Sequence, residues 1–219
     1  CGDGVIYGGV EQCDDGNLVD TDGCSNACTL NVPNLTVTTV PGSPLVPTPG
    51  SPITWTGTDD DGYAAIPVGF SFSYLGLAVP TAFPSTNGLV GFAAGSTAYQ
   101  NVSVPAAATP NGFIAWWWDD LNFGAAVGPG ASATTALLGT APNRVRVFTF
   151  LNVPRYNAAA GGSLINAEVR LYEGTNVIEV HYGALVPGTT PSGGPTTTTP
   201  VLRKLLHARS ARARGSVAT

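Results

Sequence analysis

The chain of 219 residues contains no methionine, and only 11% of its residues are charged. A cytosolic globular protein usually carries about 25% charged residues. Glycine and proline are abundant instead, with 28 and 18 residues, a composition that disfavours long helices and suits short strands joined by turns. Because no apolar run reaches the roughly 18 residues of a membrane span, we expect no transmembrane segment.

Cysteine is absent after residue 28, and the four cysteines are Cys1, Cys13, Cys24 and Cys28. Their even number and close spacing predict two disulfides in an exported protein. A Cys24–Cys28 bridge would close the smallest loop and is the least useful cross-link. Two pairings remain: Cys1–Cys24 with Cys13–Cys28, or Cys1–Cys28 with Cys13–Cys24. Because the first residue is not methionine, we expect that a secretory signal has been removed. Cleavage of a lipoprotein signal also leaves cysteine first, so a lipid on Cys1 is the alternative to a disulfide at that residue.

Basic residues are absent before Arg144. The first 28 residues carry six acids: Asp3, Glu11, Asp14, Asp15, Asp20 and Asp22. Five of the nine basic residues lie near the C-terminus: Arg203, Lys204, Arg209, Arg212 and Arg214. Opposite charges at the two ends could attract neighbouring molecules, or each could simply keep its own end soluble. The net charge of −5 and the expected export argue against a nucleic-acid partner.

Composition divides the chain into four regions. Residues 1–30 form a cysteine-rich module, 31–51 a Pro/Thr-rich linker or edge strand, 52–186 a β-domain, and 187–219 a Thr/Pro-rich linker with a basic tail. We therefore expect an all-β protein, in which a β-sandwich or jelly roll follows a small disulfide-rich N-terminal module.

Hydrophobic alternation predicts the strands of the β-domain. The predicted strands are Ile53–Thr56, Ala65–Tyr74, Gly88–Phe92, Gly112–Trp118, Ala133–Leu138, Arg144–Asn152, Ser163–Tyr172 and Asn176–Tyr182. The last two alternate most clearly, with Asn166, Glu168 and Arg170 predicted on the polar face of the first. The intervening Glu173–Asn176 segment predicts a hairpin turn that uses the positive φ available to Gly174.

Oxygen-bearing side chains are dense in the N-terminal module, and they predict a calcium site. The candidate metal ligands are Asp3, Asp14, Asp15, Asn17, Asp20 and Asp22. Calcium takes six to eight oxygen ligands, and a unit of about thirty residues is too small to be held by a hydrophobic core alone. The alternative is a solvated acidic loop held by disulfides alone.

The N-terminal module resembles the myxobacterial cysteine-rich repeat and, more distantly, the calcium-dependent Notch-type repeats. The similar stretches are CGDG at 1–4, EQCDDGN at 11–17 and DGCSNAC at 22–28. The resemblance implies calcium ligation by Asp14, Asp15, Asn17, Asp20 and Asp22, with Asp3 as a further ligand. Notch-type repeats have six cysteines rather than four, so their disulfide pairing is not transferred to this chain.

The β-domain resembles sandwich domains of bacterial surface proteins and is similar to the nidogen-type extracellular domain. The motifs, in order, are FSFSYLG at 70–76, PSTNGLVGF at 84–92, WWWDDL at 116–121, VRVFTFLNVP at 145–154 and VRLYEGTNVIEVHYG at 169–183. The resemblance implies a non-catalytic extracellular domain.

The WWWDD stretch is the most unusual local cluster of the β-domain. Strand alternation would bury Trp117 and expose Trp116 and Trp118, or the reverse. Exposed indoles stack on sugars, which predicts a glycan or partner site at Trp116, Trp118, Asp119 and Asp120; the alternative is core packing followed by an Asp turn. The Asp59–Asp61 run is either a second cation loop or a solvated turn.

Catalytic motifs are missing: no HExxH, GxSxG or P-loop occurs, and only two histidines are present. We therefore expect no enzyme. The expected function is a secreted structural or adhesive protein of the cell surface, a calcium-stabilised subunit of an extracellular fibre or matrix that associates with itself. The alternative is a monomeric adhesin module that binds a glycan or a protein partner.

Overall fold

The computed structural model describes residues 2–5, 7, 10–11, 14, 16–18, 24–29, 45–101, 110, 112–126, 130–156 and 164–183. Within these residues the chain is all-β, with thirteen strands and no helix, and so it has no helix long and apolar enough to cross a membrane. The chain divides into two compact units: Cys1–Val37 with Ser73–Ala78, and Thr38–Phe72 with Val79–Thr219.

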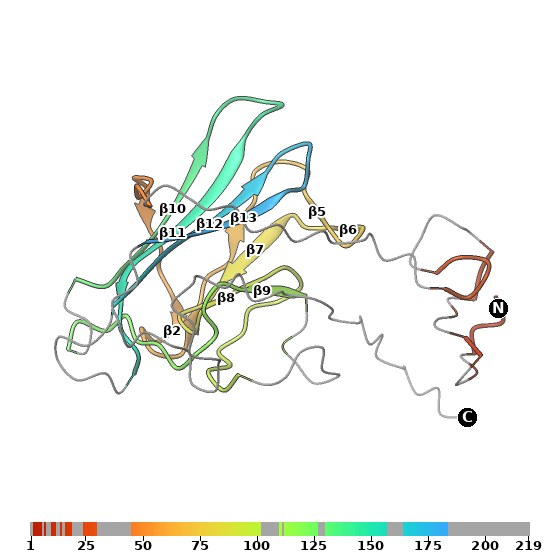
Figure 1. Ribbon diagram of the computed structural model, residues 1–219, viewed down its shortest axis with the longest axis horizontal. Helices are drawn as coiled ribbons and strands as arrows, with labels where there is room; N and C mark the ends of the chain where they lie inside the picture. Colours follow the sequence, from red (N-terminus) through yellow and green to blue (C-terminus); the bar gives the residue numbers. More distant parts are fainter. Residues whose placement is uncertain are drawn as a thin grey trace. The chain divides into compact units, whose positions relative to one another are not determined.

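A five-stranded antiparallel sheet forms one layer of the larger unit (Figure 1). Its order is β1 (Ser51–Pro52), β10 (Ser132–Leu138), β11 (Val145–Val153), β12 (Ile165–Tyr172) and β13 (Ile178–Tyr182). Successive hairpins build the sheet from β10 to β13. The turn before β13 contains Gly174 with φ of 76°, as the sequence predicts.

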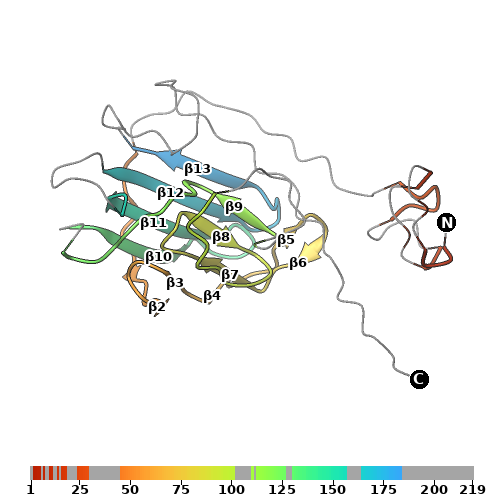
Figure 2. The ribbon, with the colours of Figure 1, turned by 90° about the horizontal axis from the view of Figure 1, so that it is seen from below.

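A second antiparallel sheet of four strands forms the other layer of the sandwich (Figure 2). Its order is β4 (Ile66–Pro67), β7 (Thr81–Pro84), β8 (Leu89–Gly91) and β9 (Phe113–Ala115). Two short hairpins complete the described strands: β2 (Thr56–Gly57) with β3 (Gly62–Tyr63), and β5 (Ser73–Tyr74) with β6 (Leu77–Ala78).

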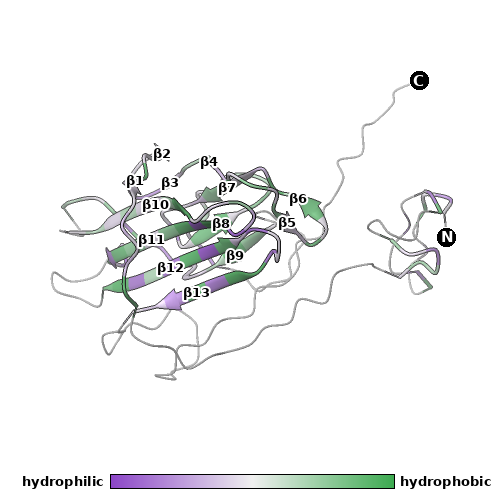
Figure 3. Cartoon of the chain, turned by 90° about the horizontal axis from the view of Figure 1, so that it is seen from above, coloured by the Kyte–Doolittle hydropathy of each residue, from purple (hydrophilic) through white to green (hydrophobic). Residues whose placement is uncertain are grey.

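The inner face of the five-stranded sheet is apolar and packs on the segment that follows β9. The register places Phe150 beside Ala167 and Phe148 beside Val169, and all four side chains are buried. Trp116 stacks on Phe150, with ring centroids 4.1 Å apart and an interplanar angle of 11°. Apolar and polar residues alternate along β12 and β13 (Figure 3), so one face of each strand is available to this core.

The outer face of the same sheet is not fully solvated, because residues 45–50 cross it before β1. The Thr48 N–H donates to the Glu168 carboxylate at 2.8 Å, and Glu168 is fully buried. The prediction that Glu168 lies on an exposed polar face is therefore wrong. Alternation places the side chain on the correct face but carries no information about a distant segment that covers it.

All eight predicted strands overlap observed strands, most closely at β10 to β13, although Ile53–Thr56 shares only Thr56 with β2. The predicted Ala65–Tyr74 strand is wrong as one element: it is split into β4 and β5, and Gly69 between them adopts φ of 91°. β7 is missing from the prediction because prolines lie before and within it, at Pro80 and Pro84. The predicted edge strand at 35–40, inside the expected linker 31–51, and the predicted tail lie outside the described residues.

Gly88 allows the turn before β8 to pass close to the tryptophan segment. Its φ is 78°, and a Cβ atom there would lie 1.8 Å from the Trp117 carbonyl oxygen. The Trp117 N–H donates to the Gly88 carbonyl at 3.1 Å, so the two backbones are in direct contact. A side chain at position 88 would therefore separate the turn from the segment that fills the core.

We predict that Gly88→Ala lowers the free energy of unfolding by more than about 2 kcal/mol, because a backbone clash adds to the cost of positive φ. The matched control is Gly76→Ala. Gly76 has φ of 80° but no atom within 4 Å of the added Cβ, so we expect a loss of only about 1 kcal/mol. Urea unfolding followed by tryptophan fluorescence measures both, and equal losses would contradict the clash.

Candidate functional site

The described part of the N-terminal module is organised around the Asp14 carboxylate. Oδ1 accepts the N–H groups of Gly4 and Gly16, both at 2.9 Å, and Oδ2 accepts the N–H of Asp3 at 3.2 Å. Burial opposes ionisation, but these N–H donors outweigh it and lower the pKa of Asp14 to about 2. One carboxylate thus joins two segments of the module that lie ten residues apart in the sequence.

Other groups approach Asp14 as well. The Asp3 side chain also acts to lower the pKa of Asp14. Ligand atoms of Glu11, Asp14 and Cys28 lie within 4.8 Å of one another. Cys28 is disulfide-bonded, so its sulfur is not a free thiolate and is not available as a metal ligand. The remaining candidate ligand atoms of this group are the carboxylate oxygens of Glu11 and Asp14.

The predicted calcium ligands are only partly described. Asp3, Asp14 and Asn17 lie in the described residues, and Asn17 is exposed. The candidate ligands Asp15, Asp20 and Asp22 lie outside them. Cys24 and Cys28 are buried and disulfide-bonded, whereas Cys1 and Cys13 are not described, so the pairing stays a prediction.

The three tryptophans of the WWWDD stretch are all buried: Trp116, Trp117 and Trp118 have exposed fractions of 1, 9 and 8%. The prediction that alternation exposes one or two of them is wrong. β9 ends at Ala115, so the period of two does not continue through the stretch. None of the three indoles presents a face for stacking on a sugar.

The tryptophans divide between two apolar clusters. Trp116 stacks on Phe150, and Trp117 packs edge-on against Tyr182 with centroids 6.3 Å apart. Trp118 instead joins Phe113 and Leu89 in a separate cluster. The stretch therefore holds the sandwich together, which is the core-packing alternative.

Asp119, predicted as a ligand residue, is used within the fold. It is 5% exposed and forms an ion pair with Arg155, whose Nε donates to Oδ2 at 2.7 Å. Asp119 Oδ1 also accepts the N–H of the next residue, Asp120, at 3.0 Å. The pair fastens the end of the tryptophan stretch to the chain that follows β11.

The fold brings the Asp59–Asp61 loop beside the segment 119–123, a meeting that the sequence does not reveal. The Phe123 N–H donates to the Asp59 carbonyl at 2.8 Å. Asn87 links the two segments: its amide donates to Asp61 Oδ1 at 2.8 Å and accepts the Leu121 N–H at 3.0 Å. Asn87 is fully buried, although its sequence context, an Asn-Gly turn, predicts solvent exposure.

The acids that meet here are electrostatically unfavourable. Burial and then the charge of Asp61 raise the pKa of Asp60, against a hydrogen bond to Asn122. Burial raises the pKa of Asp120, and the nearby charges of Asp60 and Asp61 act in the same direction. Within the described residues Asp60 Oδ1 is buried without a hydrogen-bond partner. A fully solvated turn does not describe this loop.

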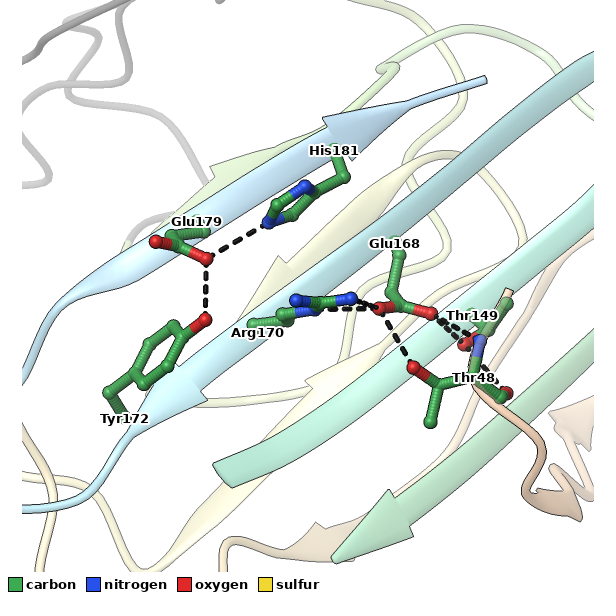
Figure 4. A network of polar contacts seen from close by, with 7 residues as sticks. All are labelled: Thr48, Thr149, Glu168, Arg170, Tyr172, Glu179 and His181. Atoms are coloured by element: carbon green, nitrogen blue, oxygen red, sulfur yellow. Dashed lines mark hydrogen bonds and ion pairs between the residues drawn. The ribbon is translucent and has the colours of Figure 1, made fainter. Parts of the chain in front are cut away.

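A network of polar side chains lies on the outer face of β11 and β12 (Figure 4). Glu168 accepts hydrogen bonds from the hydroxyls of Thr48 at 3.0 Å and Thr149 at 2.8 Å, and it forms an ion pair with Arg170 at 2.6 Å. Burial alone would raise the pKa of Glu168, but these donors outweigh it and lower that pKa. Glu168 thus ties the crossing segment 45–50 to the sheet.

The same face continues to β13 (Figure 4). The Tyr172 hydroxyl donates to Glu179 at 2.5 Å, and His181 Nε2 lies 2.9 Å from the same carboxylate oxygen. Burial opposes ionisation of Glu179, but the contacts with Tyr172 and His181 lower its pKa overall. Glu168 and Glu179 are therefore both engaged by neighbouring side chains on this face of the sheet.

We predict that Asp120→Asn raises the melting temperature at pH 7 by about 2–4 °C, corresponding to about 1 kcal/mol. A carboxyl whose pKa is raised by folding costs no stability below its unfolded pKa of about 3.9 and destabilises the fold once it ionises. The gain should therefore vanish near pH 3. Calorimetry in the presence of a chelator measures it.

The control for this prediction is Asp119→Asn, which leaves Arg155 without its ionised partner. It should lower the free energy of unfolding by about 2 kcal/mol and therefore lower the melting temperature. A lower melting temperature of Asp120→Asn under the same conditions would contradict the repulsion between these acids.

Comparison with protein families gives two matches. Residues 36–202 match the family described as NIDO related, and residues 1–29 match a domain of unknown function, DUF4215. Comparisons with curated proteins and with solved structures give no match. The first match indicates an extracellular-type domain and agrees with the nidogen-like resemblance of the β-domain. Because it spans more than half of the chain, the protein belongs to the NIDO-related family.

Proposed function

We propose that the chain is a non-catalytic structural or adhesive protein of the cell surface or extracellular matrix, stabilised by calcium at its N-terminal module. The observation that carries the proposal is the use of charged side chains in the β-domain. Two ion pairs there join segments that are distant in sequence, Asp119 with Arg155 and Glu173 with Arg144. A third pair, Glu168 with Arg170, lies within β12.

These pairs are structural in their geometry. Arg144 donates to Glu173 through Nε at 2.8 Å and also to the Gly69 carbonyl at 2.8 Å, which joins β11 to the chain after β4. Its guanidinium lies 5.7 Å from the ring centre of Phe70. A carboxylate that works as a general acid or base must reach a substrate proton. Carboxylates that are ion-paired within the chain stabilise the packing of its strands, as expected of a structural protein.

Calcium binding is supported by the crowding of carboxylates around Asp14. Asp3 and Asp14 are neighbours, and their carboxylates repel each other when both are ionised, unless a cation lies between them. The N–H groups of Asp3, Gly4 and Gly16 favour the ionised form of Asp14, and an ionised carboxylate is the kind of oxygen ligand that calcium takes. In this proposal Asp14 contributes a carboxylate oxygen, and Asp3, Asn17, Asp15, Asp20 and Asp22 supply further oxygens.

Secretion and self-association belong to the same proposal. The acidic N-terminal module and the basic residues 203–214 carry opposite charge, and a head-to-tail contact between different surfaces propagates into a fibre unless it closes into a ring. Negative-stain microscopy with calcium and with chelator tests this assembly. Single particles under both conditions would contradict it.

We predict that calcium slows cleavage after Glu11 by a glutamate-specific protease. If the module opens before it is cut, calcium at ten times its dissociation constant should slow cleavage roughly tenfold. Mass spectrometry of the timed digest measures the rate. Magnesium, which prefers a smaller octahedral site, should protect less.

Two controls isolate the calcium effect. Cleavage after Glu173, which is ion-paired with Arg144 in the β-domain, should not change with calcium. Asp14→Asn should abolish the protection, whereas Asp59→Asn, in the larger unit, should retain it. Equal cleavage after Glu11 with calcium and with chelator would contradict calcium binding, while leaving the structural role of the β-domain to the assembly test.

A further inference from the structure

β13 forms one edge of the five-stranded sheet (Figure 2). The Tyr172 N–H donates to the Val177 carbonyl at 3.0 Å, and the Gly183 N–H donates to the Asn166 carbonyl at 2.8 Å. Because hydrogen-bonded and non-hydrogen-bonded pairs alternate in an antiparallel ladder, Glu179 and His181 bond to β12. The N–H and C=O groups of Ile178, Val180 and Tyr182 therefore point away from the sheet.

The other described sheet edges are less suited to accept a strand. β1 and β4 have two residues each, and each contains a proline, Pro52 and Pro67. Proline cannot donate to a ladder and blunts an edge. β9 has three residues. β13 has five residues, none of them proline, and all five are only partly buried.

We propose that β13 pairs antiparallel with β13 of a second copy of the chain, about a two-fold axis at Val180. In this register Val180 faces the partner's Val180, and Ile178 faces the partner's Tyr182. The outward groups of all three residues then form hydrogen bonds, and the two sheets become one continuous sheet. This two-fold contact is separate from the head-to-tail contact proposed above, because it needs neither calcium nor the basic tail.

Charge selects this register over its neighbours. On the outer face, Glu179 lies opposite the partner's His181, and His181 lies opposite the partner's Glu179, so each carboxylate meets an imidazole. A shift by one pairing step in one direction places Glu179 opposite the partner's Glu179. The same shift in the other direction places the two histidines opposite each other. Like charges directly across a ladder are destabilising, so only the central register is complementary at both sites.

The inner face supports the same pairing. Ile178, Val180 and Tyr182 lie on the side of β13 that continues the apolar inner face of β12. Pairs between β-branched and aromatic side chains stabilise antiparallel ladders. A five-residue edge buries less surface than the roughly 1,200 Å² of a strong interface. We therefore expect a weak dimer, with a micromolar dissociation constant.

Sedimentation velocity of the full chain in chelator, over a concentration series up to about 0.5 mM, tests the proposal. Chelator removes calcium and thereby prevents the calcium-dependent contact. Dimerisation through β13 is therefore measured independently of the assembly test. Val180→Pro should lower the association constant roughly 100-fold, because proline removes only an outward N–H and leaves the bonds to β12 intact. Val180→Thr, which keeps the N–H, is the matched control and should dimerise like the natural chain.

Charge variants test the register. His181→Glu should weaken the dimer roughly tenfold, since it places two carboxylates opposite each other at both sites. The double exchange Glu179→His with His181→Glu restores complementarity and should recover association. Unchanged near-ultraviolet circular dichroism shows that each variant is folded.

Three results would overturn the proposal: a natural chain that stays monomeric, a Val180→Pro variant that dimerises as well as Val180→Thr, or a double exchange no better than His181→Glu. A monomer in which the amides of Ile178 and Val180 resist hydrogen exchange would show that the chain's own residues cover this edge, which also overturns it.

Discussion

The stack of Trp116 on Phe150 is the contact on which the sandwich depends, because it joins the end of β9 to the centre of the five-stranded sheet. It has a polar cost: the indole nitrogens of Trp116 and Trp117 are buried without a hydrogen-bond partner among the described residues. A buried unsatisfied donor costs about 1–3 kcal/mol. Burying some 200 Å² of indole contributes about 5 kcal/mol. Packing therefore outweighs the lost hydrogen bond, and the stretch lies in the core rather than on the surface.

Two polar contacts fix the segment that carries this stack. The Tyr182 hydroxyl donates to the Trp116 carbonyl at 2.5 Å and connects the edge strand β13 to the same segment. Asp119 then fixes the exit of the segment through Arg155. In this chain with few charged residues, the Asp119–Arg155 pair thus lies where segments distant in sequence meet.

Local patterns predicted the parts of the fold that depend on neighbours in sequence. Alternation identified β12 and β13, whose partners follow each other along the chain. It failed at Glu168 and at Trp116 to Trp118, because coverage by residues 45–50 and the bend after Ala115 are tertiary facts. The link between Asp61 and Leu121 through Asn87 was equally hidden, since an Asn-Gly pair reads as a solvated turn. For the candidate site, the sequence shows how dense the acidic residues are, but it does not show which of them lie close together in the fold.

The arginines limit how the described β-domain can recognise anything. Arg144, Arg155 and Arg170 are ion-paired within the chain. Arg146 is directed to the Val68 carbonyl at 3.2 Å, and burial lowers its pKa. The four arginines of residues 130–156 and 164–183 are therefore all engaged in contacts within the chain. Two features of the described domain are candidates for recognition: the backbone of the edge strand β13 and the crowded acids near Asp60. Of these, only the edge strand presents a regular row of donors and acceptors, and such a row is complementary to another strand.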